Sequence, residues 1–139
     1  QGALEALAGE LVCEVATDNQ LAEIERLNDS IKEARDADGQ LEAFRRDMAF
    51  HDSIVEASGN RALFESHATY NARLWRVRFL SSQRVASREG TRREHLEIVE
   101  ALKARDATAA RRALKQHLRT AEINIAAAMA EAKAQKETE

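Results

Sequence analysis

The sequence predicts an all-α protein that forms one bundle of about six helices. Three observations favour this fold class. First, the 139 residues include no proline and only five glycines, and strong helix formers such as Ala, Leu, Glu, Arg and Lys dominate. Second, apolar residues recur at helical spacing along almost the whole chain. Third, the interruptions are few, and no repeat or linker separates a second domain, so we expect residues 1–139 to form a single domain.

The first two helices are predicted over residues 4–15 and from about residue 18 onwards. Their apolar positions recur one turn apart: Leu4, Leu7, Leu11, Val12 and Val15 in the first, and Leu21, Ile24, Leu27 and Ile31 in the second. Thr17 or Asp18 can cap the second helix, because short polar side chains accept hydrogen bonds from the free N–H groups of a first turn. Cys13 lies in the first apolar stripe, so we interpret it as a small buried hydrophobe. As the only cysteine, it excludes an internal disulfide and a cysteine-rich metal site.

The third and fourth helices are separated by a clear stop signal. Asp38-Gly39 predicts a turn before the third helix. Ser58-Gly59-Asn60 ends that helix, because Gly59 suits the left-handed conformation at a helix end. Asn60 can then cap the fourth helix, expected over residues 61–80. The apolar positions are Leu41, Phe44, Met48, His51, Ile54 and Val55 in the third helix and Leu63, Phe64, Leu74, Trp75 and Phe79 in the fourth.

One long polar loop is predicted, over residues 81–90 (SSQRVASREG). The fifth helix is expected to begin near Thr91, because Thr91 and Glu94 have the spacing of a capping box. Its apolar positions are Leu96, Ile98, Val99 and Leu102. Arg105-Asp106 is expected to break it. The last helix is expected from residue 107 to the alanine-rich end, with the tail KAQKETE (133–139) frayed.

Charge and hydropathy disfavour several classes of protein. The net charge of −3 argues against nucleic-acid binding by this chain alone, because such binding depends on a basic face. Four arginines still cluster, either as a solvated face or as part of a ligand pocket: Arg73, Arg76, Arg78 and Arg84. No apolar run approaches the roughly 20 residues that span a bilayer. No signal peptide is visible either, so we expect a cytoplasmic protein with no membrane partner.

Three of the four histidines lie on the apolar faces of different predicted helices: His51, His95 and His117. An imidazole on such a face needs a partner for its nitrogens. Asp47 precedes His51 by one helical turn, which offsets the two by about 40° and about 6 Å, so both can reach one ion. A metal ion could therefore be shared by Asp47, His51, His95 and His117. Taken singly, each histidine is more often a hydrogen-bonded core residue, and we leave His67 in that class.

Such a ligand set suits a divalent transition metal, with Zn expected first and Ni, Mn, Co or Fe as alternatives. One carboxylate would leave about one positive charge on a dication, together with open coordination positions. Such a site would attract a small anion, most naturally a carboxylate. Other sites are disfavoured, because the sequence has no H-E-x-x-H, no glutamate three residues before any histidine, and no glycine-rich phosphate loop.

Three stretches of the sequence together resemble a known family. They are LEALAGELVCEVAT (residues 4–17), LEAFRRDMAFHDSIVEASGN (41–60) and REHLEIVEALKARDATAARRALKQHL (93–118). The second combines an acidic residue, a Phe-His pair and a Ser-Gly-Asn turn. The third places one histidine before an apolar helix and another in the last helix. Through them, nearly the whole chain resembles the FCD domain, the C-terminal effector-binding domain of the FadR subfamily of GntR-type bacterial transcription regulators.

The resemblance implies an antiparallel all-α bundle with a central cavity for a metal and a ligand. In metal-binding members, one aspartate and three histidines hold a divalent ion, and the matching positions here are Asp47, His51, His95 and His117. Effectors of the family are often small organic acids, whereas its founding members bind acyl-CoA and lack the metal set. Since all four positions are present here, the resemblance favours a small carboxylate effector.

The resemblance also implies a homodimer that binds DNA through an N-terminal winged helix-turn-helix domain. That domain is absent from the sequence, which begins at Gln1, so we expect this chain to be part of a longer regulator. Candidate residues for holding the effector are Arg73, Arg76, Arg78 and Asn124. Helical phase alone does not decide which arginine points inward.

Two other functions stay open at this point. A metal-dependent hydrolase or lyase would need a general base beside the metal. Glu94 and Glu97 are the only acids close to a ligand outside the Asp47 region, and Glu94 is expected to cap a helix. We therefore expect a regulatory domain and no enzyme. A helical interaction module without a metal is the other alternative.

Overall fold

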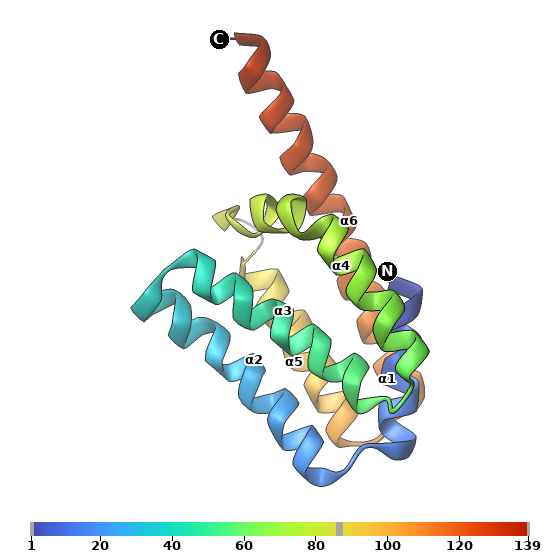
Figure 1. Ribbon diagram of the computed structural model, residues 1–139. Helices are drawn as coiled ribbons and strands as arrows, with labels where there is room; N and C mark the ends of the chain where they lie inside the picture. The colour runs from blue at the N-terminus through green and yellow to red at the C-terminus, as the bar shows by residue number, and fades with distance from the viewer. Residues whose placement is uncertain (1, 86–87, 139) are drawn as a thin grey trace.

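Six α-helices follow one another along the chain: α1 (Gly2–Val15), α2 (Asp18–Asp38), α3 (Gln40–Ala57), α4 (Arg61–Ser82), α5 (Arg88–Lys103) and α6 (Ala107–Thr138). The computed structural model describes residues 2–85 and 88–138, and these ranges contain no strand. α2 and α3 form an antiparallel pair, and α6 packs against α1, α4 and α5 (Figure 1). The predicted all-α bundle of about six helices is confirmed.

Most helix boundaries follow the turn chemistry of the sequence. Thr17 caps α2 in a reciprocal box: its hydroxyl accepts from the Gln20 N–H at 3.1 Å, and the Gln20 side chain accepts from the Thr17 N–H at 2.8 Å. Gly39 joins α2 to α3 at a φ of +88°, a backbone conformation that strains other residues. Asn60 caps α4 by accepting from the Leu63 N–H at 3.0 Å. These boundaries confirm the predicted signals.

Three boundaries differ from the prediction. α4 continues to Ser82 and α5 starts at Arg88, so helix takes up much of the predicted 81–90 loop, of which residues 86–87 lie outside the described residues. Thr91 lies inside α5 rather than at its start. The capping-box spacing predicted the wrong start for this helix, because two residues three positions apart also lie on one face of a continuous helix. The tail is helical through Thr138 rather than frayed, because most of its residues are strong helix formers; residue 139 lies outside the described residues.

The core lies where α1, α3, α5 and α6 meet. Its fully buried side chains include Val12, Phe50, Ile54, Ile98, Leu102 and Leu114. Removing each such side chain from water stabilises the fold by about 1.5–3 kcal/mol. Gly9 lets α1 approach α6 closely, because a Cβ at this position would overlap the Leu114 side chain. Cys13 is buried in the same core, as predicted.

α6 has a packed part and a projecting part. Its first turns pack against α1 and α5 and carry His117 into the interior, where the side chain is buried. Its last turns project beyond the other helices (Figure 1). Among the helices that the structure describes, none is both long and apolar enough to cross a membrane.

Candidate metal centre

Four side chains from three helices converge inside the bundle. α3 contributes Asp47 and His51, α5 contributes His95, and α6 contributes His117. Nε2 of His117 lies 3.3 Å from Nε2 of His51 and 3.1 Å from Nε2 of His95. Oδ1 of Asp47 lies 3.4 Å from Nε2 of His95 and 3.8 Å from Nε2 of His51. The structure thus brings together all four residues that the sequence analysis named as candidate metal ligands.

The separations of these atoms fit the donor set of a metal. Two nitrogens bound at about 2.1 Å to one ion, with an angle of about 90–110° between the bonds, lie about 3.0–3.4 Å apart. The two shortest distances between histidine nitrogens, 3.1 and 3.3 Å, fall in this range. Three neutral rings that turn their Nε2 lone pairs toward one point would repel each other unless a proton or a cation lay between them. A divalent ion satisfies all three.

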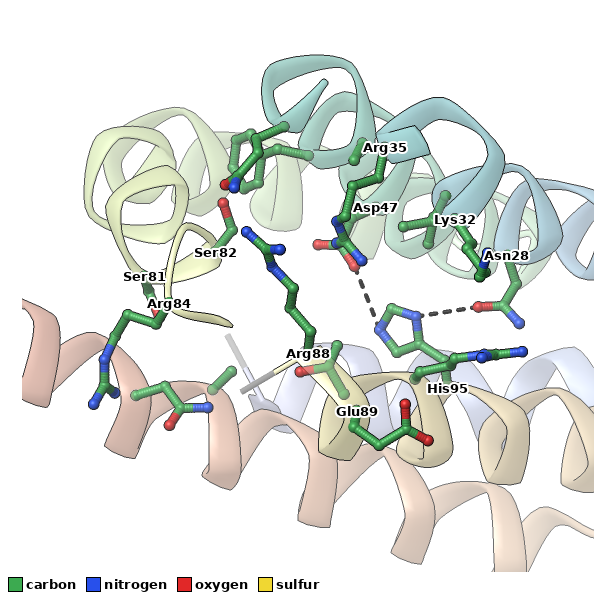
Figure 2. Close-up of a pocket in the computed structure, with 18 of the residues that line it drawn as sticks. Asn28, Lys32, Arg35, Asp47, Ser81, Ser82, Arg84, Arg88, Glu89 and His95 are labelled. Atoms are coloured by element: carbon green, nitrogen blue, oxygen red, sulfur yellow. Dashed lines mark hydrogen bonds and ion pairs between the residues drawn. The ribbon is translucent and has the colours of Figure 1, made fainter. Parts of the chain in front are cut away.

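The nitrogens on the far side of the rings meet oxygen atoms. Nδ1 of His51 lies 2.7 Å from a carboxylate oxygen of Glu5. Nδ1 of His95 lies 3.2 Å from the side-chain oxygen of Asn28 (Figure 2). An oxygen acceptor at Nδ1 favours the tautomer that carries its proton there, which leaves the Nε2 lone pair for a metal.

The third ring, that of His117, has no hydrogen-bond acceptor at its Nδ1 atom among the described residues. The residue beside that atom, Glu94, was expected from the sequence to cap a helix. Nδ1 of His117 lies 3.4 Å from Oε2 of Glu94, and both atoms are buried without a hydrogen-bond partner. Glu94 is therefore no helix cap. It lies one residue before His95 on α5 and turns toward α6, behind the His117 ring. This position leaves Glu94 on the side of the ring that faces away from the shared centre.

Glu5 is a fully buried carboxylate that bridges two histidines. Its second oxygen lies 2.7 Å from Nε2 of His67, so one acid contacts both His51 and His67. Burial raises the pKa of Glu5, but the charge of His51, hydrogen bonds with His51 and His67, and the charge of Arg78 together outweigh burial and hold the pKa well below its usual range. The sequence analysis missed this residue. One signal could have found it, since Glu5 lies on the same face of its helix as Ala8 and Val12, which are buried.

His95 is held in the neutral form. Burial, and then the neighbouring His117 and His51 rings, lower the pKa of His95 well below its usual range. Neutral imidazole is the form that binds a metal, so the electrostatics of the site favour binding at neutral pH.

A cavity of about 360 Å³ opens beside the four residues, and Asp47, His95 and His117 form part of its wall. Basic side chains outnumber acidic ones around it: Lys32, Arg35, Arg78, Arg84, Arg88 and Arg92 against Asp29, Asp36, Asp47 and Glu89. Arg35 from α2 and Arg88 from α5 reach into the cavity (Figure 2). Such a wall attracts small anions.

Two of the four candidate effector residues lie at this cavity. Arg78 is buried in its wall and donates to Oδ1 of Asn71 at 2.8 Å. Asn124 lines the cavity from α6. Arg73 and Arg76 are exposed on α4 and lie outside the cavity wall. The rotation of α4 about its axis decides this difference, and that rotation is set by packing against neighbouring helices.

Comparisons with known proteins agree with this architecture. The chain matches the family described as the FCD domain over residues 1–120. Among solved structures, E. coli McbR/YncC is similar, with a TM-score of 0.78 and 22% sequence identity, over 94% of this chain and 64% of that chain. This chain thus corresponds to less than two thirds of the length of that protein, and the likeness concerns the fold. No curated protein matches the sequence.

Proposed function

Because the chain belongs to the FCD domain family, we propose that it is the ligand-sensing domain of a GntR-type transcription regulator that binds a divalent metal and a small organic acid. One observation carries the proposal: three histidine nitrogens and one carboxylate converge beside a cavity whose wall has more basic than acidic side chains. A plain helical interaction module would have no use for such a buried polar cluster, because burying unpaired polar groups costs stability.

The residues present fit a metal of the Zn, Ni, Co, Mn or Fe type. The ligand set would consist of three imidazoles and one carboxylate, those of His51, His95, His117 and Asp47. When bound, the ion would supply positive charge and an open coordination position for a carboxylate oxygen. Arg78 and Asn124, which line the same cavity, would orient the rest of the effector.

A catalytic role has less support. The carboxylate closest to the set besides Asp47 and Glu5 is that of Glu94, which faces Nδ1 of His117 rather than the shared centre. From there it can orient the ring but cannot take a proton from a water held at the centre. We therefore favour a regulatory function without turnover.

In the full-length protein, effector binding would act on DNA binding through a population shift. An effector with different affinities for two arrangements of the bundle favours one of them, and in a homodimer this would change the spacing of two winged helix-turn-helix domains. The size of the effect is limited by that difference in affinity.

Elemental analysis of untagged protein, purified without chelator, tests the proposal. We expect about one transition-metal ion per chain. His95→Ala and His117→Ala should lower both metal content and Tm. Leu63→Ala is the control, a buried core residue on α4, which carries none of the four candidate ligands, and it should lower Tm while the protein keeps the ion. Absence of metal from the wild-type protein, even after incubation with Zn, Ni or Mn, would contradict the metal centre and leave the family assignment standing.

Metal-loaded and EDTA-treated protein should then be screened against small carboxylates by thermal shift. Acids that raise the Tm of the metal-loaded form alone would support the sensor function. A screen in which no acid distinguishes the two forms would contradict the metal as an anchor for the effector.

A further inference from the structure

Two arginines that were not candidates from the sequence reach into the cavity from different helices. Arg35 lies in the last turn of α2, and Arg88 is the first residue of α5 (Figure 2). They lie close enough for the charge of Arg88 to act on Arg35: burial, and then the charge of Arg88, lower the pKa of Arg35, although the charges of Asp47 and Asp36 oppose this. A protein gains nothing in stability from placing two partly buried guanidinium groups together. An anionic partner would remove the repulsion.

The guanidinium of Arg88 has donors with no acceptor. Its Nε and Nη2 atoms are buried, and neither has a hydrogen-bond partner. These two nitrogens form one edge of the planar group, the edge that grips a carboxylate or phosphate with two parallel hydrogen bonds. Unsatisfied polar groups at a cavity wall are expected where a ligand supplies the missing partner.

The acids around the cavity offset this repulsion only in part: the charges of Asp47 and Asp36 act on Arg35, but among the described residues no acid forms an ion pair with Arg35 or Arg88. Asp36 pairs with Lys32 at 2.7 Å, and Asp47 lies at the histidine cluster. Arg84, also in the wall, pairs with Glu131 at 3.2 Å. One carboxylate of an effector would be used at the metal centre, where about one positive charge remains after Asp47. A second anionic group is therefore needed to balance the arginine pair.

We propose that Arg35 and Arg88 form a second anionic subsite, so that the effector is a small acid with two anionic groups. This inference rests on the proposed function: one carboxylate faces the metal centre, and a second carboxylate or a phosphate on the same molecule binds the arginine pair. The cavity of about 360 Å³ is near the small end of ligand pockets, about 300–1,000 Å³, and so fits a compact molecule.

The experiment compares acids that differ only in the second anionic group. Metal-loaded protein is titrated by calorimetry with succinate against butyrate, malate against 2-hydroxybutyrate, and 3-phosphoglycerate against glycerate. We expect at least one dianion to bind about 10- to 100-fold more tightly than its partner, as for charge-assisted hydrogen bonds to an arginine. The carboxylate and phosphate pairs identify which group the subsite takes.

Arg88→Gln and Arg35→Gln should remove this preference while the affinity for the monoanion stays the same. Arg93→Gln is the matched control, because Arg93 is exposed on the same helix as Arg88 and lies outside the cavity wall. It should keep the full preference. Metal content is measured for each variant, so that a disturbed metal centre is recognised as such.

Three results would overturn the subsite. Monoanions and dianions could bind equally in a metal-dependent way, which would leave the proposed function intact. The preference could persist in Arg88→Gln and Arg35→Gln, which would assign it to other residues. Absence of binding by every acid to the metal-loaded protein would contradict both this subsite and the proposed function.

Discussion

Glu5 is a buried carboxylate that contacts one of the candidate ligands, His51, from behind its ring. Its two oxygens each lie 2.7 Å from a ring nitrogen, one on His51 and one on His67, and all three side chains are fully buried. A carboxylate behind a metal-binding histidine fixes the tautomer and raises the basicity of the ring. Glu5 thereby connects α1, the first helix of the domain, to His51, a candidate ligand on α3.

We expect Glu5→Gln to weaken metal binding by about 10- to 100-fold, the usual effect of removing such a carboxylate. Glutamine keeps the shape but loses the charge, and its amide N–H₂ would face a ring nitrogen. Competition with a chromophoric chelator measures the affinity. Glu10→Gln on the same helix is the control, because Glu10 pairs with Arg111 at 2.8 Å away from the centre. Equal affinities in the two variants would show that Glu5 does not support the ligand.

His67 predicts a pH dependence of stability in the metal-free protein. Burial lowers the pKa of His67, but hydrogen bonds to Asp52 and Glu5, and the charges of both acids, outweigh burial and raise the pKa to about 9. Because this is above the ordinary value of about 6.5, the stabilisation is fully present below pH 6.5 and is lost as the pH rises to 9.

The free energy of unfolding should therefore fall by up to about 3 kcal/mol between pH 6.5 and 9. Urea denaturation in EDTA at several pH values measures the slope. His67→Gln should be less stable at pH 6.5 and should show a flatter profile. A wild-type profile as flat as that of the variant would mean that His67 is not charged in the folded protein.

At the scale of helices, α1 approaches α6 closely at Gly9. A Cβ at Gly9 would overlap the Leu114 side chain, whereas nothing lies within 4 Å of a Cβ at Gly90 in α5. Replacing a helical glycine by alanine normally stabilises by about 0.5–1 kcal/mol, and overpacking a core costs about 1–3 kcal/mol.

The same substitution should thus have opposite effects at the two glycines. We expect Gly9→Ala to lower the free energy of unfolding by about 1 kcal/mol and Gly90→Ala to raise it by up to about 1 kcal/mol. Chemical denaturation measures both. If Gly9→Ala were as stable as Gly90→Ala, α1 and α6 would lie farther apart than the structure places them.

The helices were predictable from the sequence because their signals are local. Thr17, Gly39 and Asn60 act within one turn of chain, and each lies where the prediction placed a boundary. The start of α5 was wrong, because Thr91 and Glu94 have a spacing that occurs both at a helix start and inside a helix.

The site was predictable only in part, because some of its contacts join residues that lie far apart in the sequence. Asp47 and His51 lie one helical turn apart, so their spacing indicates a shared site. Glu5 meets His51 across 46 residues, and its place on an apolar helix face indicates burial but not its partner. Arg78 differs from Arg73 and Arg76 only in the side of α4 that it occupies. Contacts of this range depend on how whole helices pack, which periodicity does not specify.

At the scale of the whole molecule, a metal at the candidate centre would join α3, α5 and α6, the three helices that carry its ligands. A ligand that binds the folded state alone stabilises it by about 4 kcal/mol at 1,000 times its Kd. Removing the metal should therefore lower Tm.

The loss of stability on metal removal should differ between parts of the chain. Hydrogen exchange in EDTA should speed up around residues 47–51, 93–99 and 113–119, because local opening there no longer has to break metal bonds. The mostly exposed end of α6, residues 129–138, should exchange at the same fast rate with and without metal, since it projects beyond the other helices (Figure 1). If removal of the metal changed exchange in α3 alone, the ion would be bound by Asp47 and His51 without joining the three helices, and it could not transmit effector binding across the bundle.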